Sequence, residues 1–374
     1  MPRALIVVVL ALAACDAPLD PSPQTEAASL PLLAPGLTLG TTLYGSADLD
    51  ALDPSARDHL DDAVRAGLGG FTYYVDWADL EATERTHTLD EFTATLDALQ
   101  SLGVVPFVNV TVGDSGEYNL PPGIGDGEGG IAPGVALDDD AVTERFGRVL
   151  DRIVPVLVAR GGFFLGVGNE MDDYLDGDRQ EREAYAAFVQ SARERVHEIE
   201  PRLAVGVTLT NRAVRDQSAT YRAMRAVSDL VAVNHAPIAP DFFVRDADDI
   251  RAGYRDVMGT YDDEPLLIQE LTCPSPSSMG ASEAWQADCF RQLLGEVHAD
   301  PRVRFASVFT LQDFDGETCD AVREALIGDE DLPPALAERI GDYLCGLGVL
   351  RPDGSPKPAW PVILDAVGES RRGD

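Results

Sequence analysis

The segment of residues 161–174 reads GGFFLGVGNEMDDY and decides the fold class. Its apolar run stops at Asn169 and Glu170, and a helical pattern begins near Arg179. This is typical of a buried parallel strand, which is apolar on both faces and meets polar residues where the chain leaves the sheet. A carboxylate at the carboxyl end of such a strand lies where α/β barrels and open α/β sheets carry their chemistry.

A second segment has the same form. Residues 265–270 read PLLIQE, an apolar strand that ends in Glu270. Hydrolysis of a glycosidic bond requires two carboxyl groups: one protonates the leaving oxygen, and the other attacks the sugar or activates a water on its opposite face. Glu170 and Glu270 match that requirement. The sequence gives no distance between them, so it leaves retention and inversion of the anomeric configuration both open.

Strand-like runs and amphipathic helical stretches alternate along the chain, and eight such pairs can be counted. The predicted strands are residues 37–43, 70–75, 104–110, 163–167, 203–208, 230–233, 265–269 and 303–311. The predicted helices are residues 54–66, 89–102, 140–159, 181–199, 218–227, 247–258, 282–297 and 334–343. This alternation predicts an α/β fold, a single-domain (β/α)8 TIM barrel over residues 37–370. The long Gly/Pro-rich loop 113–137 is either functional or mobile.

The composition limits the classes of partner. Of the 374 residues, 45% are hydrophobic, which is enough for a large core. The chain carries 64 acidic and 29 basic residues, a net charge of −35, and its one lysine is Lys357. Nucleic acid is therefore not an expected partner, because phosphate binding depends on basic patches. We expect a monomer with an acidic, solvated surface; an acidic cleft for a cationic substrate is the alternative.

The amino terminus resembles a bacterial lipoprotein signal. Arg3 precedes an apolar stretch, residues 4–13, that is too short to span a bilayer, and LAAC follows at residues 12–15. The resemblance implies that residues 1–14 are removed and that Cys15 is lipidated. The alternative is an ordinary secretory signal. In both cases the protein is exported, and in the first it is held at the cell envelope by its lipid anchor, with residues 15–36 as a flexible tether.

Four further cysteines lie in the last third of the chain: Cys273, Cys289, Cys319 and Cys345. An even number in an exported protein indicates two disulfides, although four cysteines allow three pairings. We predict the local pairing, Cys273 with Cys289 and Cys319 with Cys345. A zinc site is the rival interpretation, but no CxxC motif or histidine at ligand spacing supports it. No metal or other cofactor is expected.

The chain resembles the clan A glycoside hydrolases, retaining β/α barrels that include cellulase-like, xylosidase-like and galactanase-like families. The Asn-Glu pair that ends strand four is the most specific shared motif. The segments 77–81, 102–106 and 348–360 are also similar to that clan. The resemblance implies that Asn169 binds the sugar 2-hydroxyl, that Glu170 is the acid/base and that Glu270 is the nucleophile. It also implies a β-linked poly- or oligosaccharide as the substrate.

Other polar and aromatic residues end predicted strands and are candidates for substrate binding: Tyr44, Trp77, Asn109, Asn234, His235, Gln312 and Asp313. Trp77 has loop packing as its alternative role. His235 has a place in the core as its alternative. Both alternatives stay open at this point.

Three positions depart from the clan. Residues 73–76 read YYVD where cellulase-like members have an arginine, and residues 310–314 read TLQDF where a tryptophan is common. A tyrosine is common after strand six, where this chain has Asn234 and His235. These departures support an alternative, a non-catalytic glycan-binding lipoprotein on the same barrel. A bilobed solute-binding lipoprotein would instead need a domain boundary, and none is visible in the sequence.

Overall fold

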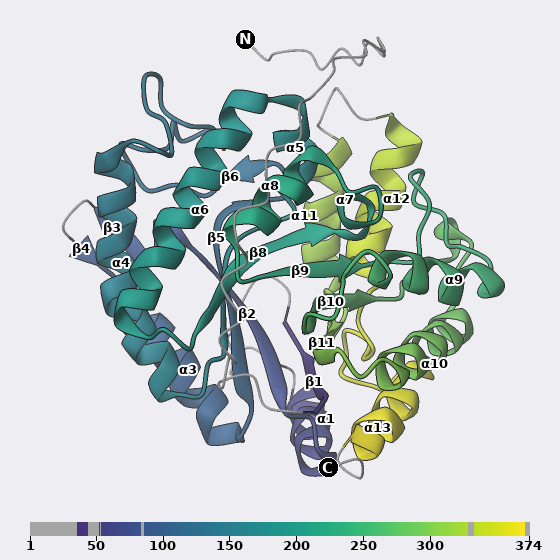
Figure 1. Cartoon of the computed structure of the whole chain (residues 1–374). Coiled ribbons are helices and arrows are strands. Elements are labelled where there is room, and N and C mark those ends of the chain that lie inside the picture. The colour runs from purple at the N-terminus through teal and green to yellow at the C-terminus, as the bar shows by residue number, and fades with distance from the viewer. Residues whose placement is uncertain (1–35, 44–51, 53, 84–85, 328–332, 371–374) are drawn as a thin grey trace.

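The computed structural model describes residues 36–43, 52, 54–83, 86–327 and 333–370 (Figure 1). Eight parallel strands pair in sequence order, and the last pairs with the first, so the sheet closes into a barrel. The barrel strands are β1 (Thr38–Thr41), β2 (Gly70–Asp76), β5 (Val105–Asp114), β7 (Phe164–Asn169), β8 (Ala204–Thr210), β9 (Leu230–His235), β10 (Leu266–Thr272) and β11 (Val303–Phe309). The predicted single-domain TIM barrel is confirmed.

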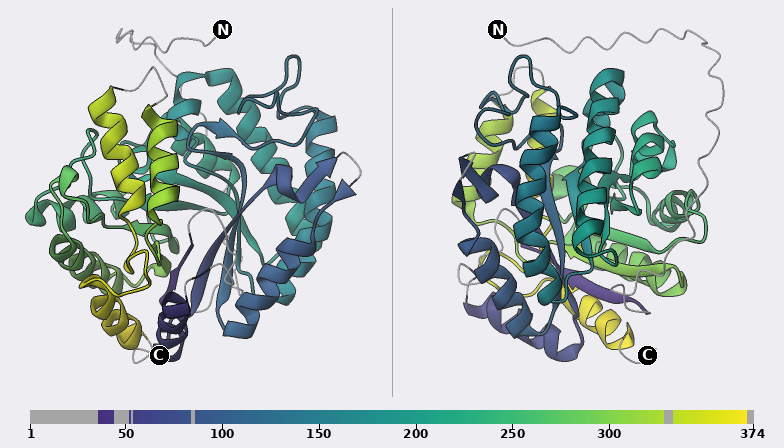
Figure 2. Two further views of the ribbon diagram at one scale, coloured as in Figure 1. Left: turned by 180° about the vertical axis from the view of Figure 1, so that it is seen from behind. Right: turned by 60° about the vertical axis from the view of Figure 1, so that its left-hand side comes forward.

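Helices surround the barrel on all sides (Figure 2). The outer helices are α1 (Pro54–Ala66), α3 (Asp90–Leu102), α4 (Asp140–Ala159), α6 (Arg179–Ile199), α8 (Ala219–Val227), α9 (Ala247–Met258), α10 (Glu283–Ala299) and α13 (Ala359–Ser370). Short elements sit between them: β3 (Glu81–Thr83), β4 (Thr86–His87), β6 (Glu117–Tyr118), α2 (Trp77–Leu80), α5 (Asp172–Gly177), α7 (Asn211–Arg215) and η1 (Ser277–Met279). Within the described ranges, no helix has the length and apolar character needed to cross a membrane.

The eighth β/α unit differs from the expectation. A helix does lie at the predicted position, α12 (Pro334–Cys345), but it pairs with α11 (Gly316–Ile327) as a hairpin. The helix that packs on α1 and α10 and completes the outer ring is α13, close to the chain's C-terminus (Figure 1). Pro361 lies in the first turn of α13, where proline is tolerated.

Aromatic side chains fill the barrel at the amino ends of its strands. The Phe107 ring lies 4.6 Å from the Phe164 ring and 5.2 Å from the Phe305 ring, centroid to centroid. Gly70 makes room for them, because a Cβ at that position would lie 2.5 Å from the Phe305 ring. This apolar plug closes one end of the barrel, so any chemistry belongs to the other end.

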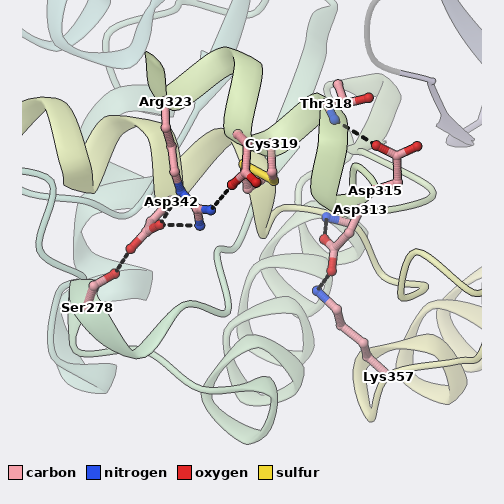
Figure 3. The surroundings of a disulfide bond; sticks show 11 residues. Ser278, Asp313, Asp315, Thr318, Cys319, Arg323, Asp342 and Lys357 are labelled. Atoms are coloured by element: carbon pink, nitrogen blue, oxygen red, sulfur yellow. Dashed lines mark hydrogen bonds and ion pairs between the residues drawn. A yellow bond between two sulfur atoms is a disulfide. The ribbon is translucent and has the colours of Figure 1, made fainter. Parts of the chain in front are cut away.

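Two disulfides stabilise the loops beyond β10 and β11. Cys273 is bonded to Cys289 and Cys319 to Cys345, so the predicted pairing is confirmed and the zinc alternative is wrong. The first joins the segment after β10 to α10, and the second joins α11 to α12 (Figure 3).

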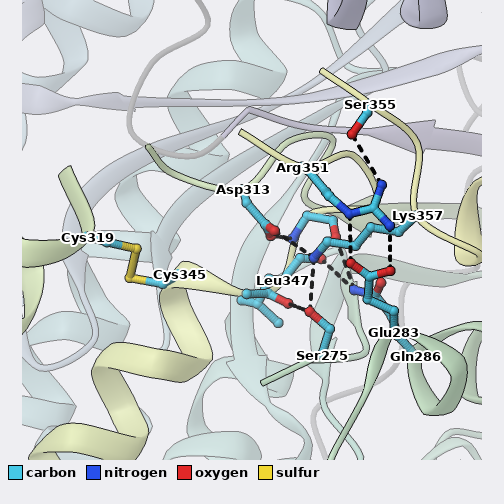
Figure 4. A network of polar contacts seen from close by, with 12 residues as sticks. Ser275, Glu283, Gln286, Asp313, Cys319, Cys345, Leu347, Arg351, Ser355 and Lys357 are labelled. Carbon is cyan, nitrogen blue, oxygen red and sulfur yellow. Dashed lines mark hydrogen bonds and ion pairs between the residues drawn. A yellow bond between two sulfur atoms is a disulfide. The ribbon is translucent and has the colours of Figure 1, made fainter. Parts of the chain in front are cut away.

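The chain's single lysine also holds this region together. Lys357 is 3% exposed, and its Nζ donates to Asp313 Oδ2 at 2.6 Å and to Ser275 Oγ at 2.9 Å. Figure 4 shows the three side chains converging from the segments that follow β10, follow β11 and precede α13. A buried ion pair of this kind fixes the relative position of the chain segments that carry its members. Loss of one partner leaves the other charge buried and unpaired.

We predict that Lys357→Met lowers the free energy of unfolding by about 3–5 kcal/mol, because the Asp313 carboxylate loses its counter-charge. Urea unfolding measures the change. The control is Arg179→Met, whose pair with Glu183 is exposed, with a side chain 80% accessible; it should cost less than about 1 kcal/mol. Equal losses in the two variants would contradict a structural role for the buried pair.

Candidate active site

The carboxyl end of β7 is irregular. As a result, the side chains of two successive residues, Asn169 and Glu170, both accept hydrogen bonds from Asn234. Its register with β8 shifts between Gly166 and Asn169. The φ angle is 102° at Gly168 and 48° at Glu170. Successive residues of a regular strand face opposite sides, whereas a bulge can re-aim one of them. The Asn234 amide reaches both side chains: its Nδ2 donates to Asn169 Oδ1 at 3.1 Å and to Glu170 Oε1 at 2.9 Å.

Strand β10 has a similar irregularity beside the second glutamate. Its register shifts against both neighbouring strands after Ile268. The Gln269 side chain is fully buried, and its Nε2 donates to Asn169 Oδ1 at 2.8 Å and to the Tyr74 hydroxyl at 3.2 Å. The Tyr74 hydroxyl in turn donates to Glu270 Oε1 at 2.6 Å. Gln269 therefore connects Asn169, the neighbour of Glu170, with Tyr74, the hydrogen-bond donor to Glu270.

A polar layer beneath the glutamates fixes the orientation of the Gln269 amide. Asn109 Nδ2 donates to Gln269 Oε1 at 2.7 Å, and Thr208 Oγ1 donates to the same oxygen at 2.6 Å. Because that oxygen accepts from below, the amide nitrogen points toward Asn169 and Tyr74. Gly166 gives Asn109 its space, since a Cβ there would lie 2.7 Å from the Asn109 side chain.

A third carboxylate lies beside the pair. Asp114, at the end of β5, accepts a hydrogen bond from Asn169 Nδ2 at 2.9 Å. The Asn169 oxygen already accepts from Gln269 and Asn234, so the rotamer and the amide orientation of Asn169 are both fixed. Burial raises the pKa of Asp114, while the hydrogen bond from Asn169 opposes that shift.

The two glutamates differ in what stabilises their charge. Burial raises the pKa of Glu170 well above its ordinary value, and the charges of Glu270 and Asp172 add to the shift. Burial raises the pKa of Glu270 too, but the Tyr74 hydroxyl favours its ionised form. Glu270 is therefore the group that ionises first, and its charge keeps the proton on Glu170. One acid and one base on facing strands is an arrangement suited to proton transfer.

Five of the candidates that end predicted strands meet in this cluster. Glu170, Glu270, Asn169 and Asn234 are joined by hydrogen bonds, and Asn109 supports them from the layer below. Tyr44 lies outside the described residues. Gln269, Tyr74 and Asp114 were missed. Each is at or near the carboxyl end of a strand, so that position was the available signal, but the bulge and the true length of β5 could not be read from the pattern.

Trp77 does not line the cluster, which corrects one expectation. Its side chain is completely buried, with ring centroids 4.8 Å from Phe146 and 5.8 Å from Phe188, on helices α4 and α6. The indole Nε1 donates to Glu81 Oε2 at 3.1 Å, and Glu81 is paired with Arg145 at 2.9 Å. Trp77 therefore packs in the core between barrel and helices, where no sugar can reach it.

His235 is also buried, on the face of β9 opposite Asn234. Its ring packs edge-on against Tyr254 of α9, with centroids 5.5 Å apart, and is screened from solvent. Burial lowers the pKa of His235 to about 4, so the ring is neutral at pH 7. The structure thus supports the core role and corrects the substrate-binding one, because adjacent strand residues point to opposite faces.

Gln312 and Asp313 are engaged in loop structure beyond β11. Gln312 Nε2 donates to the Pro352 carbonyl at 2.8 Å, and Asp313 is held by Lys357 and by the Gly348 N–H at 2.8 Å. Their side chains bind the segment 348–357 rather than the two glutamates. Over the described part of the chain, no group of three or more His, Cys, Asp or Glu residues is arranged to hold a metal.

No protein-family model and no curated protein sequence matches this chain. Solved structures do share its architecture. A GH5_18 protein from Streptomyces cattleya in complex with GlcNAc superposes with a TM-score of 0.69 at 16% identity, over 91% of this chain and 82% of that one. A variant of it is in complex with Manβ1-4GlcNAc, with a TM-score of 0.68 at 15% identity over 90% and 82% of the two chains.

Two further neighbours extend this likeness. The exo-β-1,4-mannosidase Op5Man5 from Opitutaceae bacterium strain TAV5 gives a TM-score of 0.64 at 16% identity, over 90% of this chain and 60% of that one. A family 39 glycoside hydrolase from Bacteroides cellulosilyticus WH2 gives 0.60 at 14% identity, over 89% and 64%. What this chain shares with these clan A glycoside hydrolases is their fold, the eight-stranded parallel barrel surrounded by helices.

Proposed function

We propose that this protein is a retaining glycoside hydrolase that cleaves β-linked poly- or oligosaccharides. The observation that carries the proposal is the single hydrogen-bonded cluster that holds Glu170 of the β7 end and Glu270 of β10 at one mouth of the barrel. The different environments of these carboxyl groups support an acid role for Glu170 and a nucleophile role for Glu270.

The proposed reaction has two displacements. In the first, the ionised Glu270 attacks the anomeric carbon while Glu170 donates its proton to the leaving oxygen, so a glycosyl ester forms and the glycosidic bond breaks. In the second, Glu170 takes a proton from water, whose oxygen attacks the same carbon and releases Glu270. The Tyr74 hydroxyl donates to Glu270 Oε1 and so stabilises the ionised carboxylate that attacks. Asn169 would contact the sugar 2-hydroxyl.

β-Linked mannosides are the first substrates to test. The support is indirect: one neighbour is an exo-β-1,4-mannosidase and others are in complex with Manβ1-4GlcNAc. This two-carboxylate chemistry uses protein side chains and water alone.

We predict that Glu170→Gln and Glu270→Gln each lower kcat/KM by roughly 10²–10⁴-fold or more, because each removes a group that acts in the transition state. The measurement is release of reducing ends from β-linked mannan and manno-oligosaccharides. Azide should restore turnover of an activated aryl glycoside by Glu170→Ala, since it attacks the glycosyl ester without a base.

The control for this experiment is Glu117→Gln. Glu117 is an exposed carboxylate on β6, and its loss should leave kcat/KM unchanged. Full activity in both cluster variants would refute the assignment. Tight glycan binding by the unmodified protein with no product over days would favour the non-catalytic alternative.

We predict that Tyr74→Phe lowers kcat/KM about tenfold or more, because a hydrogen bond to the charged Glu270 is lost. It should also shift the acidic limb of the pH profile upward. The reason is that the hydrogen bond holds down the pKa of Glu270, so without it Glu270 takes up its proton at higher pH. Tyr73→Phe is the matched control, because Tyr73 stacks on Phe92 outside the barrel. An unshifted acidic limb in Tyr74→Phe would contradict this role.

We also propose that the protein is an exported lipoprotein of the cell envelope, on the basis of the LAAC segment that ends at Cys15. Cys15→Ser should abolish incorporation of labelled fatty acid and move the protein from the membrane fraction to the soluble one. Cys273→Ser, which removes a disulfide cysteine instead, should leave the labelling intact. Unchanged labelling of Cys15→Ser would exclude the anchor.

A further inference from the structure

A hollow lies beyond the carboxyl ends of β10 and β11, at the same end of the barrel as the glutamates. It has a volume of about 470 Å³ and is bounded by residues 275–278 after β10, by Asp313 and Phe314 after β11, and by the α11–α12 hairpin. That volume is within the usual range of ligand sites, roughly 300–1,000 Å³. Ser275 follows Glu270 by five residues, so the two Cα atoms lie within about 18 Å of each other even if the chain is fully extended.

A disulfide and hydrogen bonds link the walls of this hollow. The Cys319–Cys345 disulfide joins the two helices of the hairpin, and both half-cystines line the hollow. The Ser275 N–H and hydroxyl both donate to the Gly346 carbonyl, at 3.0 and 2.9 Å, which ties the segment after β10 to the end of α12. A site held open in this way loses little conformational freedom when a ligand binds.

The polar groups of the hollow are charge-balanced. Arg323 donates to Asp342 Oδ1 from Nε at 3.0 Å and from Nη2 at 2.6 Å, and the Ser278 hydroxyl donates to the other oxygen of Asp342 (Figure 3). Asp313 is balanced by Lys357. Both carboxylates of the lining, Asp313 and Asp342, are thus paired with a cation. The hollow offers hydrogen-bond donors and acceptors but no unpaired carboxylate, which suits a neutral, hydroxyl-rich ligand better than a cationic one.

The hollow also has apolar surface. The half-buried Phe314 ring and Pro276 and Pro352 line it beside the charged pairs. A sugar ring needs this combination, because its hydroxyls form hydrogen bonds at the edge while its C–H faces pack on aromatic and apolar carbon.

We propose that this hollow is a subsite for a sugar unit remote from the bond that is cleaved. This rests on the proposed function, and it deepens it by assigning a place for a further sugar unit of the substrate, between the segment after β10 and the α11–α12 hairpin. Binding energy from such a remote unit can be used to orient the bond that reacts over the two glutamates.

The test is calorimetric titration in the Glu170→Gln background, where turnover does not consume the probe. The probes are the β-1,4-linked tetrasaccharides of mannose, glucose and xylose. We expect at least one to bind, and Asp342→Asn and Phe314→Ala each to weaken its binding about tenfold. Phe314→Ala leaves the ion pairs of the hairpin untouched, so it stays informative if Asp342→Asn disturbs folding.

Asp320→Asn is the matched control. Asp320 lies on α11, whereas Asp342 lies on α12, and both face Arg323. The distance from Asp320 to Arg323 is 3.6 Å, but the Asp320 side chain is 83% exposed and outside the hollow. Its loss should change binding by less than about twofold. The subsite is overturned if no tetrasaccharide binds, or if Asp342→Asn and Phe314→Ala bind as tightly as their parent.

Hydrolysis of the same tetrasaccharides by the unmodified protein separates the two proposals. Cleavage together with unchanged binding in Asp342→Asn and Phe314→Ala would overturn the subsite and keep the hydrolase. Binding that those two variants weaken, with no cleavage, would keep the subsite and overturn the hydrolase.

Discussion

The buried amide of Gln269 is the interaction on which the rest of the candidate site depends. Its oxygen accepts from Asn109 and Thr208, and its nitrogen donates to Asn169 and Tyr74. A buried amide left without partners would cost about 1–3 kcal/mol, so the satisfied arrangement is strongly preferred. Because Tyr74 contacts one glutamate and Asn169 stands next to the other in sequence, strands β5 and β8 fix the orientation of both through a single side chain.

This arrangement requires strands that are locally irregular. A regular strand would send Gln269 and Glu270 to opposite faces, and likewise Asn169 and Glu170. The register shifts in β7 and β10 relax that alternation. The irregular strand requires unusual backbone conformations. Gly168 must be glycine, since a Cβ there would lie 1.9 Å from the Tyr185 hydroxyl, and Glu170 adopts a positive φ. Strain of this kind persists where the surrounding structure holds it, and it concentrates at functional sites.

The same irregularities explain what the sequence could and could not predict. Strand order, the barrel and the two glutamates follow from apolar runs that end in polar residues, a signal that survives a bulge. A bulge does, however, change which face of the strand a residue points to, so the face cannot be predicted from the alternation of residues. In β9 the alternation holds, but the sequence does not show which of its two faces points into the barrel: Asn234 reaches Glu170, whereas His235 packs against Tyr254. The role of Trp77 stays open in the sequence because strand-end position alone does not distinguish the barrel mouth from the layer under the helices.

The hydrogen-bond donors around the two glutamates are uncharged, in a chain that has few basic residues. The hydrogen bonds found to Glu170 and Glu270 come from a phenol and amides, groups that carry no charge. A neighbouring cation would lower the pKa of a carboxyl group and favour its ionised form. Here neutral donors favour ionisation of Glu270, which receives the Tyr74 hydrogen bond, and its charge then retains the proton on Glu170. Tyr74 is one of these neutral donors, while Lys357, the only lysine in the sequence, braces the loops beyond β10 and β11.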